Sequence, residues 1–328
     1  MHYRRLGKTE FMVSEISLGT WQVGGRWGDP FDPQNAENIL HKAIDLGINF
    51  IDTADVYSDG LSESAVAKAV KSRSEEVYIA TKCGRRIQPH VASEFSVKRL
   101  TGFVEDSLRN MNIDCIDLIQ LHCPPTEIYY RPEIFEAFDR LKDQGKIRHL
   151  GVSVEKVEEA IKAIEYPNVT AVQIIFNMFR HRPADLFFKL ASEKDIGIIA
   201  RVPLASGLLT GKMTEKTQFS KEDHRFFNRN GDAFDKGETF SGVNYQDGLE
   251  AVEQLQKELG KDAPMALYAI RWILMFPEIS CVIPGASRIS QLVENSSAGY
   301  LPPFNPKQME AVQEIYNKTI KSFVHHLW

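Results

Sequence analysis

The chain of 328 residues combines 43% hydrophobic with 25% charged residues and carries a formal net charge of -5. This composition predicts a globular enzyme with a large core, and the mild acidity gives no reason to expect a nucleic acid or a membrane as partner. No secretory signal and no stretch near the roughly 20 apolar residues of a membrane span are found, so we expect a cytoplasmic protein. Four scattered cysteines, at 83, 115, 123 and 281, are typical of reduced thiols.

Eight short apolar runs recur along the chain and predict strands. They lie at 15–21, 48–53, 77–82, 115–122, 147–153, 169–175, 196–202 and 279–285. The segments between them have the spacing of amphipathic helices, for example 33–47, where Gly47 is a predicted C-cap. Strands that alternate with such helices indicate a parallel sheet buried on both faces. Eight repeats without a break in composition favour one single domain, a (β/α)8 TIM barrel over residues 1–328.

Two segments depart from this alternation. The polar, glycine-rich stretch 212–245 is too long for a turn, and we interpret it as a long loop after the seventh strand, on the face where barrel enzymes carry their active sites. Residues 302–328 predict an extra C-terminal helix, whose last residues could cover the barrel or form a subunit contact. A metal pair of His325 and His326 is a weak interpretation because no further ligands accompany them, and we expect no metal site.

Functional side chains stand at the ends of the first four predicted strands. They are Trp21, Asp52, Lys82 and His122, and Tyr57 lies in the loop after the second strand. Each has a simpler interpretation on its own: a helix cap for Asp52, an ordinary strand-end lysine, a buried histidine or a packing tyrosine. Because a barrel brings the carboxyl ends of its strands together, we expect the carboxylate of Asp52, the ammonium of Lys82, the imidazole of His122 and the phenol of Tyr57 to meet at one mouth.

Their combined chemistry suits the reduction of a carbonyl group. Asp52 would keep Lys82 charged, and the Lys82 ammonium would lower the pKa of the Tyr57 phenol, which would then serve as a general acid near neutral pH. His122 could donate a hydrogen bond to the carbonyl oxygen. An alternative is a Schiff-base aldolase that uses Lys82 as nucleophile and Tyr57 as acid. Asp55 is interpreted as a loop cap.

The motifs FIDTADVYSDG (50–60), IATKCG (79–84) and DLIQLHCPP (117–125) resemble those of the aldo-keto reductases. The similarity extends from LGTW near the start to IPGASRISQLVENSSA near the end. PLASGLLTGK resembles the bacterial stress- or inositol-type branch and the potassium-channel β-subunit relatives. The resemblance implies NADPH-dependent reduction of aldehydes or ketones to alcohols by hydride transfer, with a catalytic tetrad of Asp52, Tyr57, Lys82 and His122. It also leaves open a slow-turnover NADPH-binding sensor or regulatory subunit.

The cofactor site is expected outside a Rossmann motif, since no G-x-G-x-x-G follows a strand and GLLTGKM does not match a P-loop. Barrels can bind phosphates in the loops after strands seven and eight. By resemblance, the residues that bind NADPH/NADP+ here are Gly19, Thr20, Trp21, Asp52, Ser153, Gln173, Arg201, Val202, Pro203, Leu204, Ser206, Gly207, Lys212, Arg225, Gly285, Ser287, Arg288, Gln291, Glu294 and Asn295.

Some of these positions carry a specific role. Ser153 and Gln173 would hold the nicotinamide carboxamide, and either Arg225 or Arg229 could close over the pyrophosphate. Arg288 favours NADPH over NADH because a guanidinium pairs bidentately with phosphate, although it could also be a solvated residue at a helix start.

Two positions differ from the family pattern. Val154 stands where Asn or Arg usually follows the serine, and Arg201 replaces the aromatic residue that normally stacks on the nicotinamide. We hypothesise that Arg201 weakens the binding of NADP+ relative to NADPH, because its charge would lie near the positive ring.

The substrate is expected to be a small-molecule carbonyl compound in an aromatic-walled pocket. The predicted contacts are Trp21, Trp27, Tyr57 and His122, together with aromatic residues of 226–240 and of the C-terminal tail. The sequence does not identify the substrate, and we expect a monomer or a homodimer.

Overall fold

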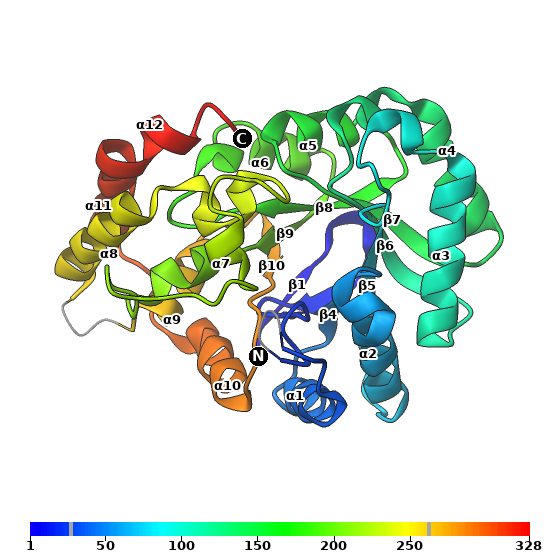
Figure 1. The fold of residues 1–328 in the computed structure, drawn as a ribbon, viewed down its shortest axis with the longest axis horizontal. Coiled ribbons are helices and arrows are strands. Elements are labelled where there is room, and N and C mark those ends of the chain that lie inside the picture. The colour runs from blue at the N-terminus through cyan, green and yellow to red at the C-terminus, as the bar shows by residue number, and fades with distance from the viewer. Residues whose placement is uncertain (26–28, 261–263) are drawn as a thin grey trace.

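The computed structural model describes residues 1–25, 29–260 and 264–328 and shows a barrel of parallel strands (Figure 1). Its strands are β3 (Leu18–Gly19), β4 (Phe50–Asp52), β5 (Tyr78–Cys83), β6 (Ile116–His122), β7 (Ile147–Ser153), β8 (Val169–Ile175), β9 (Gly197–Arg201) and β10 (Ile279–Val282). They pair in chain order from β3 to β10. Parallel bridges from Ile16 to Val282 and from Gly19 to Gly285 join the two edges, so the barrel is nearly closed. Every strand overlaps a predicted run, which confirms the predicted fold class.

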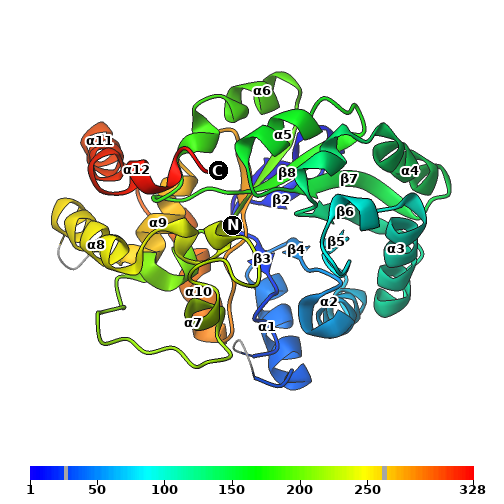
Figure 2. The same cartoon turned by 45° about the horizontal axis from the view of Figure 1, so that its top comes forward.

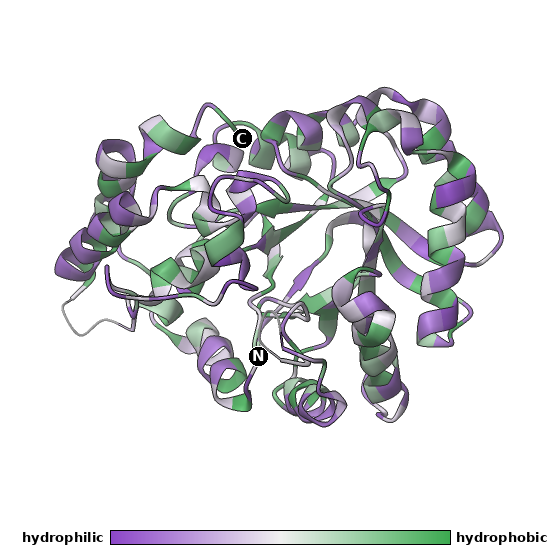
Figure 3. Cartoon of the chain, in the orientation of Figure 1, coloured by the Kyte–Doolittle hydropathy of each residue, from purple (hydrophilic) through white to green (hydrophobic). Residues whose placement is uncertain are grey.

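Helices connect the strands and surround the barrel (Figure 2). Those between consecutive strands are α1 (Pro33–Asp45), α2 (Leu61–Lys71), α3 (Val97–Met111), α4 (Pro132–Asp143), α5 (Val157–Ala163) and α6 (Phe187–Glu193). Further along the chain lie α8 (Tyr245–Leu259), α9 (Met265–Ile273) and α10 (Ile289–Ser297). The helices carry both hydrophilic and hydrophobic residues (Figure 3), as expected for elements that pack one face on a barrel and expose the other.

Helix α1 shows how the local sequence sets the ends of an element. The side chain of Asp32 accepts hydrogen bonds from the amides of Gln34 and Asn35, and Pro33 occupies the first turn, where no amide is needed. After the helix, Gly47 adopts a φ of 83°, which glycine reaches without strain. The C-cap of α1 is Leu46, so the predicted Gly47 follows the cap by one residue.

A short antiparallel hairpin, which we did not predict from the sequence, is formed by β1 (Tyr3–Arg5) and β2 (Met12–Ser14). Its apolar residues join the inward-pointing side chains of the barrel strands in one cluster. The members of this cluster are Leu6, Phe11, Val13, Phe50, Tyr78, Ala80, Leu118, Ala171, Ile199, Cys281 and Ile283. The hairpin therefore completes the interior of the barrel.

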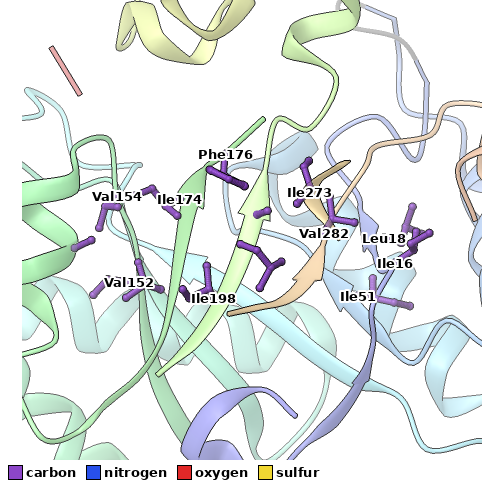
Figure 4. Close-up of a cluster of buried hydrophobic side chains, with 14 of the residues drawn as sticks. Ile16, Leu18, Ile51, Val152, Val154, Ile174, Phe176, Ile198, Ile273 and Val282 are labelled. Atoms are coloured by element: carbon purple, nitrogen blue, oxygen red, sulfur yellow. The ribbon is translucent and has the colours of Figure 1, made fainter. Parts of the chain in front are cut away.

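The period of two along each strand separates an outer from an inner layer of side chains. Outward-pointing residues such as Ile51, Val152 and Ile198 belong to the large core between strands and helices (Figure 4). Inward-pointing residues become polar towards the carboxyl ends: Phe50 is followed two positions later by Asp52, and Ile199 by Arg201. The alternation thus places polar side chains inside the mouth of the barrel.

The predicted long loop follows β9 and contains α7 (His224–Phe227). The predicted C-terminal helix is present as α11 (Pro306–Ile315) and α12 (Lys321–Val324), which a π-helical turn (Tyr316–Ile320) joins. Beyond α12, the indole of buried Trp328 donates a hydrogen bond to Asp235 of the loop at 2.8 Å, so the last residues pack against that loop. No helix among the described residues combines the length and apolarity that a membrane crossing needs.

Candidate active site

Asp52, Lys82 and Tyr57 form a chain of contacts at the mouth of the barrel. Lys82 is fully buried, and its Nζ lies 2.5 Å from Asp52 Oδ2, 2.8 Å from the Thr53 carbonyl oxygen and 3.2 Å from the Tyr57 hydroxyl. The rings of Tyr57 and His122 meet edge to face, with centroids 6.1 Å apart. Because β4, β5 and β6 are neighbours, their inward-pointing end residues converge. The structure therefore brings the four residues of the predicted tetrad together.

Two glutamines hold the second oxygen of the Asp52 carboxylate. Gln120 and Gln173 donate from Nε2 to Asp52 Oδ1 at 3.0 and 2.8 Å. Both oxygens of this buried carboxylate are thus hydrogen-bonded, as burial of a charge requires. We predicted Gln173 but not Gln120 as a site residue. Gln120 lies two positions before His122 on β6, so the inward alternation was the signal that could have identified it.

Burial and neighbouring charges together set the protonation of Tyr57 and Lys82. Burial raises the pKa of the Tyr57 phenol, although the Lys82 ammonium acts in the opposite direction. The expectation that Lys82 brings this pKa below its usual value is therefore wrong in this structure, because loss of water outweighs one nearby charge. Burial lowers the pKa of Lys82, but Asp52 and Tyr57 more than offset it and leave the pKa raised. At neutral pH the pair is a phenol beside an ammonium.

His122 is buried beside positive charges. Burial, followed by the charges of Lys82 and Arg85, lowers the pKa of its imidazole well below the usual value, so the ring is neutral near pH 7. Its Nδ1 is buried and has no hydrogen-bond partner among the described residues. A neutral imidazole carries one N–H donor, which is what the predicted hydrogen bond to a carbonyl oxygen needs.

These groups border a cavity of about 580 Å³. All the predicted cofactor-binding residues line it except Ser287, and Trp21, Tyr57 and His122 line it as predicted substrate contacts. Ser287 instead donates from its hydroxyl and its amide to Gln291 Oε1, at 3.1 and 3.0 Å, and so orients a lining side chain. Lys82 does not line the cavity itself but contacts the lining residue Tyr57. The predicted contact Trp27 lies outside the described residues.

Several lining residues were not predicted. They are Gln22, Thr210, Met213, His224, Glu238, Ala266, Ile283 and Ser290. Ile283 continues the inward alternation of β10 and could have been identified from it. His224 and Glu238 belong to the long loop, whose course no periodicity sets.

The expected aromatic wall is smaller than predicted. In the described part of the chain, no aromatic residue of 226–240 or of the C-terminal tail lines the cavity. Phe240 packs instead against Phe219 and Tyr245, and Trp328 packs against the loop. Aromatic lining is provided by Trp21, whose indole lies nearly parallel to the Tyr57 ring at 6.3 Å, and by Tyr57 itself.

The backbone after β9 is strained where it borders the cavity. Val202, Ala205 and Ser206 have left-handed φ values of 55°, 46° and 55°. Left-handed conformations are costly for residues other than glycine, above all for a β-branched one, and such strain is concentrated at ligand sites. With the cations Lys212 and Arg225 beside it, this loop suits the phosphates of a dinucleotide.

The two candidate arginines for a pyrophosphate clamp differ in position. Arg225 lines the cavity, pairs bidentately with Asp223 and reaches the Ser206 carbonyl oxygen at 3.4 Å. Arg229 is exposed and lies over the ring of Tyr245 at 5.1 Å. Arg225 therefore remains the candidate.

The N-terminus of α10 borders the far end of the cavity. Arg288 is the N-cap residue of this helix, and its exposed side chain makes no hydrogen bond or ion pair within the described residues. Glu294 lies 4.0 Å from Lys212, and Asn295 donates to the Gly285 carbonyl oxygen at 3.3 Å. An exposed guanidinium at a helix N-terminus suits a phosphate.

Arg201 ends β9 and points into the cavity as a paired cation. Its Nη2 donates to the Val154 carbonyl oxygen at 3.1 Å and to Glu155 Oε2 at 3.0 Å. Val154 thus contributes its backbone, while its side chain is buried in the outer core. The hypothesis drawn from the sequence considered the charge of Arg201 alone, and the structure adds an ion pair with Glu155.

The structure changes the interpretation of Asp55 and shows the contacts of His325. Both carboxylate oxygens of Asp55 are buried without a hydrogen-bond partner in the described structure, so Asp55 is not a loop cap. Burial, and next the charge of Glu63, raises the pKa of Asp55 to about 7. His325 contacts the Tyr316 hydroxyl at 2.8 Å and Asp185 at 2.9 Å, which engages both ring nitrogens.

Comparison with known proteins identifies the class and then the family. Solved structures with a similar fold include oxidoreductases, among them the glycerol dehydrogenase AKR11B4 from Gluconobacter oxydans, which is 29% identical with a TM-score of 0.77 over 97% of this chain and 96% of that chain. The sequence pattern of the Aldo/keto reductase family matches residues 15–317, so the chain belongs to the aldo-keto reductase family. This confirms the resemblance drawn from the motifs.

Relatives and solved structures agree with this assignment over nearly the whole chain. The chain is 32% identical to the aldo-keto reductase YhdN of Bacillus subtilis (strain 168), covering 98% of this chain and 91% of YhdN. It is 28% identical to a probable voltage-gated potassium channel subunit beta of Oryza sativa subsp. japonica, over 96% of each protein. The holo form of aldo-keto reductase AKR11C1 from Bacillus halodurans has 28% identity, 96% coverage of each chain and a TM-score of 0.76.

Proposed function

We propose that the protein is an NADPH-dependent oxidoreductase that reduces aldehydes or ketones to alcohols. Family membership supports an oxidoreductase with a nicotinamide cofactor and a small carbonyl substrate. The observation that carries the reaction is the 3.2 Å contact between Lys82 Nζ and the Tyr57 hydroxyl, next to the buried Asp52–Lys82 pair.

The protonation states support a role for Tyr57 as general acid. When bound, the reduced nicotinamide supplies a hydride to the carbonyl carbon. Tyr57 keeps its proton until the carbonyl oxygen gains negative charge and then donates it. The Lys82 ammonium, held by Asp52, stabilises the phenolate that remains. His122 directs its single N–H at the same oxygen and orients it.

The geometry disfavours the aldolase alternative. A Schiff base requires a neutral amine, whereas the raised pKa of Lys82 keeps the buried amine protonated beside Asp52. Treatment with borohydride and a carbonyl substrate is therefore expected to leave Lys82 unlabelled.

A preference for NADPH over NADH is part of the proposal. Its support is Arg288, which offers an exposed guanidinium at the start of α10 on the cavity wall. A cytoplasmic location and a monomeric or homodimeric state remain predictions from the sequence.

The test is a panel of aldehydes, ketones, sugars and polyols, assayed by NADPH absorbance in both directions for the wild type and Tyr57→Phe. Tyr57→Phe is expected to lower kcat/KM by roughly 10²–10⁴-fold, the usual contribution of a general acid, with an unchanged Kd for NADPH. Tyr130→Phe, which alters an exposed tyrosine, is the matched control and should keep full activity.

Two outcomes would contradict the proposal in different ways. Retention of most activity by Tyr57→Phe would remove Tyr57 from its role as the acid. Tight NADPH binding by the wild type without turnover across the panel would favour a cofactor-binding sensor over a reductase.

A further inference from the structure

Four charged side chains surround the point where β9 enters the cavity. Arg201 and Glu238 line the cavity, and Arg85 and Glu155 lie directly behind them. Glu155 Oε2 is 3.0 Å from Arg201 Nη2, and Glu155 Oε1 is 3.3 Å from Arg85 Nη1. Glu238 Oε1 is 3.0 Å from Arg85 Nη1, and Glu238 Oε2 is 3.8 Å from Arg201 Nη1. The two guanidiniums therefore face two carboxylates.

The predicted tetrad does not require this cluster, and neither does the binding of phosphates. Charged groups that are nearly withdrawn from water are costly unless they are paired. A cluster of four such groups at a cavity wall therefore indicates a role in binding. That role is not to bind a metal: Cys123, Glu155 and Glu238 present ligand atoms within 4.8 Å of one another, but Arg85 and Arg201 already neutralise both carboxylates.

Glu238 of this cluster belongs to the long loop after β9. Ser206 donates from its hydroxyl to the Glu238 carbonyl oxygen at 3.2 Å, which ties the segment to the strained turn after β9. Asp235 accepts hydrogen bonds from the Gly237 amide at 2.7 Å and from the Trp328 indole at 2.8 Å. Glu238 thus reaches the cavity from a segment that is anchored on both sides.

The cluster lies where the charge of a bound cofactor would change. A hydride donor must lie beside the carbonyl carbon that Tyr57 and His122 address, and its phosphates must reach the turn at 202–207. Arg201 immediately precedes this turn and lines the same cavity. The nicotinamide ring, which becomes positive on oxidation, would therefore lie against Arg201 and its partners.

We infer that Glu238 is a specificity-determining residue, which offsets the charge of Arg201 and thereby sets the relative affinity of the pocket for the oxidised and the reduced cofactor. This inference rests on the proposed function, since it concerns the same nicotinamide site. It also refines the hypothesis that Arg201 weakens the binding of NADP+ relative to NADPH. The difference between the two affinities now depends on how far Glu238 neutralises the charge of Arg201. Arg201 alone would disfavour NADP+, and Glu238 counteracts that effect.

The test is direct binding of NADPH and NADP+ by calorimetric titration at pH 8.5. At this pH the Glu238 carboxyl is ionised, because burial and Glu155 raise its pKa to about 7. Removal of one charge by Glu238→Gln, which keeps the shape of the side chain, is expected to raise the ratio Kd(NADP+)/Kd(NADPH) roughly tenfold. Arg201→Met should lower the same ratio, and the double variant should return it towards the wild-type value.

Glu294→Gln is the matched control, because it removes a carboxylate from the far end of the same cavity. It should change both dissociation constants by the same factor. Equal effects of Glu238→Gln on both cofactor forms would overturn the inference and leave the proposed function intact. If the wild type bound neither form, the proposed function itself would fail. Should Glu238→Gln not fold, as judged by circular dichroism, Glu238→Asp replaces it: the shorter side chain moves the carboxylate away from Arg201 and should raise the ratio in the same direction, whereas an unchanged ratio would overturn the inference.

Discussion

The two sides of the active-site mouth are built in different ways. On one side, Asp52, Lys82 and His122 stand at inward positions of three adjacent strands, and the register of the sheet fixes their spacing. On the other side, Glu238 comes from the long loop and Arg288 from the start of α10. Their placement depends on tertiary contacts rather than on a ladder of hydrogen bonds.

On the proposed function, this difference separates the residues that carry the chemistry from those that select the cofactor. The side formed by Asp52, Lys82 and His122 is called the strand-built side below. In it, the buried Asp52–Lys82 pair has its hydrogen-bond partners within the protein. The opposite side, formed by the long loop and the start of α10, is called the loop-built side. It presents charged side chains to the cavity, among them Arg288, which is exposed, and Lys212, with 73% of its side chain exposed. Changes on the strand-built side should therefore affect folding and catalysis together, whereas changes on the loop-built side should affect ligand binding.

Breaking the strand-built side at Lys82 is expected to give the largest effect. Lys82→Met removes one member of a fully buried ion pair and leaves Asp52 charged without its partner, so the free energy of unfolding should fall by about 3–5 kcal/mol. Adding Asp52→Asn removes the remaining charge and should recover part of this loss. Urea denaturation of the wild type, the single variants and the double variant measures these changes.

An exposed ion pair provides the control for this prediction. Lys68 Nζ lies 3.0 Å from Glu37 Oε2, but the Lys68 side chain is 72% exposed. Lys68→Met should therefore leave the urea midpoint unchanged. If Lys82→Met were equally harmless, the claim that the strand-built side depends on a buried pair would be wrong.

The same contrast explains how much the sequence revealed. Asp52, Lys82 and His122 could be predicted because a strand-end position in a barrel fixes where a side chain lies. Glu238 and its ion pairs could not, since only the folded loop brings residue 238 to Arg85 and Arg201. The β1–β2 hairpin was missed because β1 carries two arginines and β2 begins with an exposed residue, so neither strand forms the buried apolar run by which the barrel strands were recognised.

Protonation was the least predictable property of the site. The Tyr57 pKa was expected to fall because a cation was expected nearby, and the cation is present at 3.2 Å. The direction was nevertheless wrong, because the sequence does not show how much water the phenol loses.

Asp55, in the loop that follows β4, allows a second test next to the strand-built side. Its pKa of about 7 in the folded protein lies above the usual value near 3.9, so folding favours its protonated form. The associated stability is present at low pH and is lost as the pH rises through 7. Asp55→Asn cannot ionise, so its free energy of unfolding relative to the wild type should rise by about 3 kcal/mol between pH 5 and pH 8, since the linkage is about 1.4 kcal/mol per pH unit up to pH 7.

Comparing two pH values cancels the cost of the buried asparagine amide, which is the same at both. Asp59→Asn is the control in the same loop, because the Asp59 side chain is 91% exposed. It should follow the pH dependence of the wild type. Parallel pH profiles for Asp55→Asn and the wild type would show that Asp55 is ionised in the folded protein.

The smallest expected effect belongs to Arg288 on the loop-built side. Arg288 has no partner among the described residues, so its replacement should leave stability unchanged. If its guanidinium binds the 2′-phosphate, Arg288→Gln should weaken NADPH binding roughly tenfold and leave NADH binding unaltered, because only NADPH carries that phosphate. Titration with both cofactors measures the two dissociation constants.

The control must remove a positive charge near the cavity without altering its lining. Lys221→Gln does this, because Lys221 belongs to the same long loop as Arg225 but is exposed and does not line the cavity. If long-range attraction alone favoured NADPH, both variants would lower its affinity equally, since the two lost charges are the same. A loss confined to Arg288→Gln would instead require a direct contact, because NADPH and NADH differ only at the 2′-phosphate. In that case one exposed side chain on the loop-built side selects the cofactor, while the strand-built side carries the chemistry.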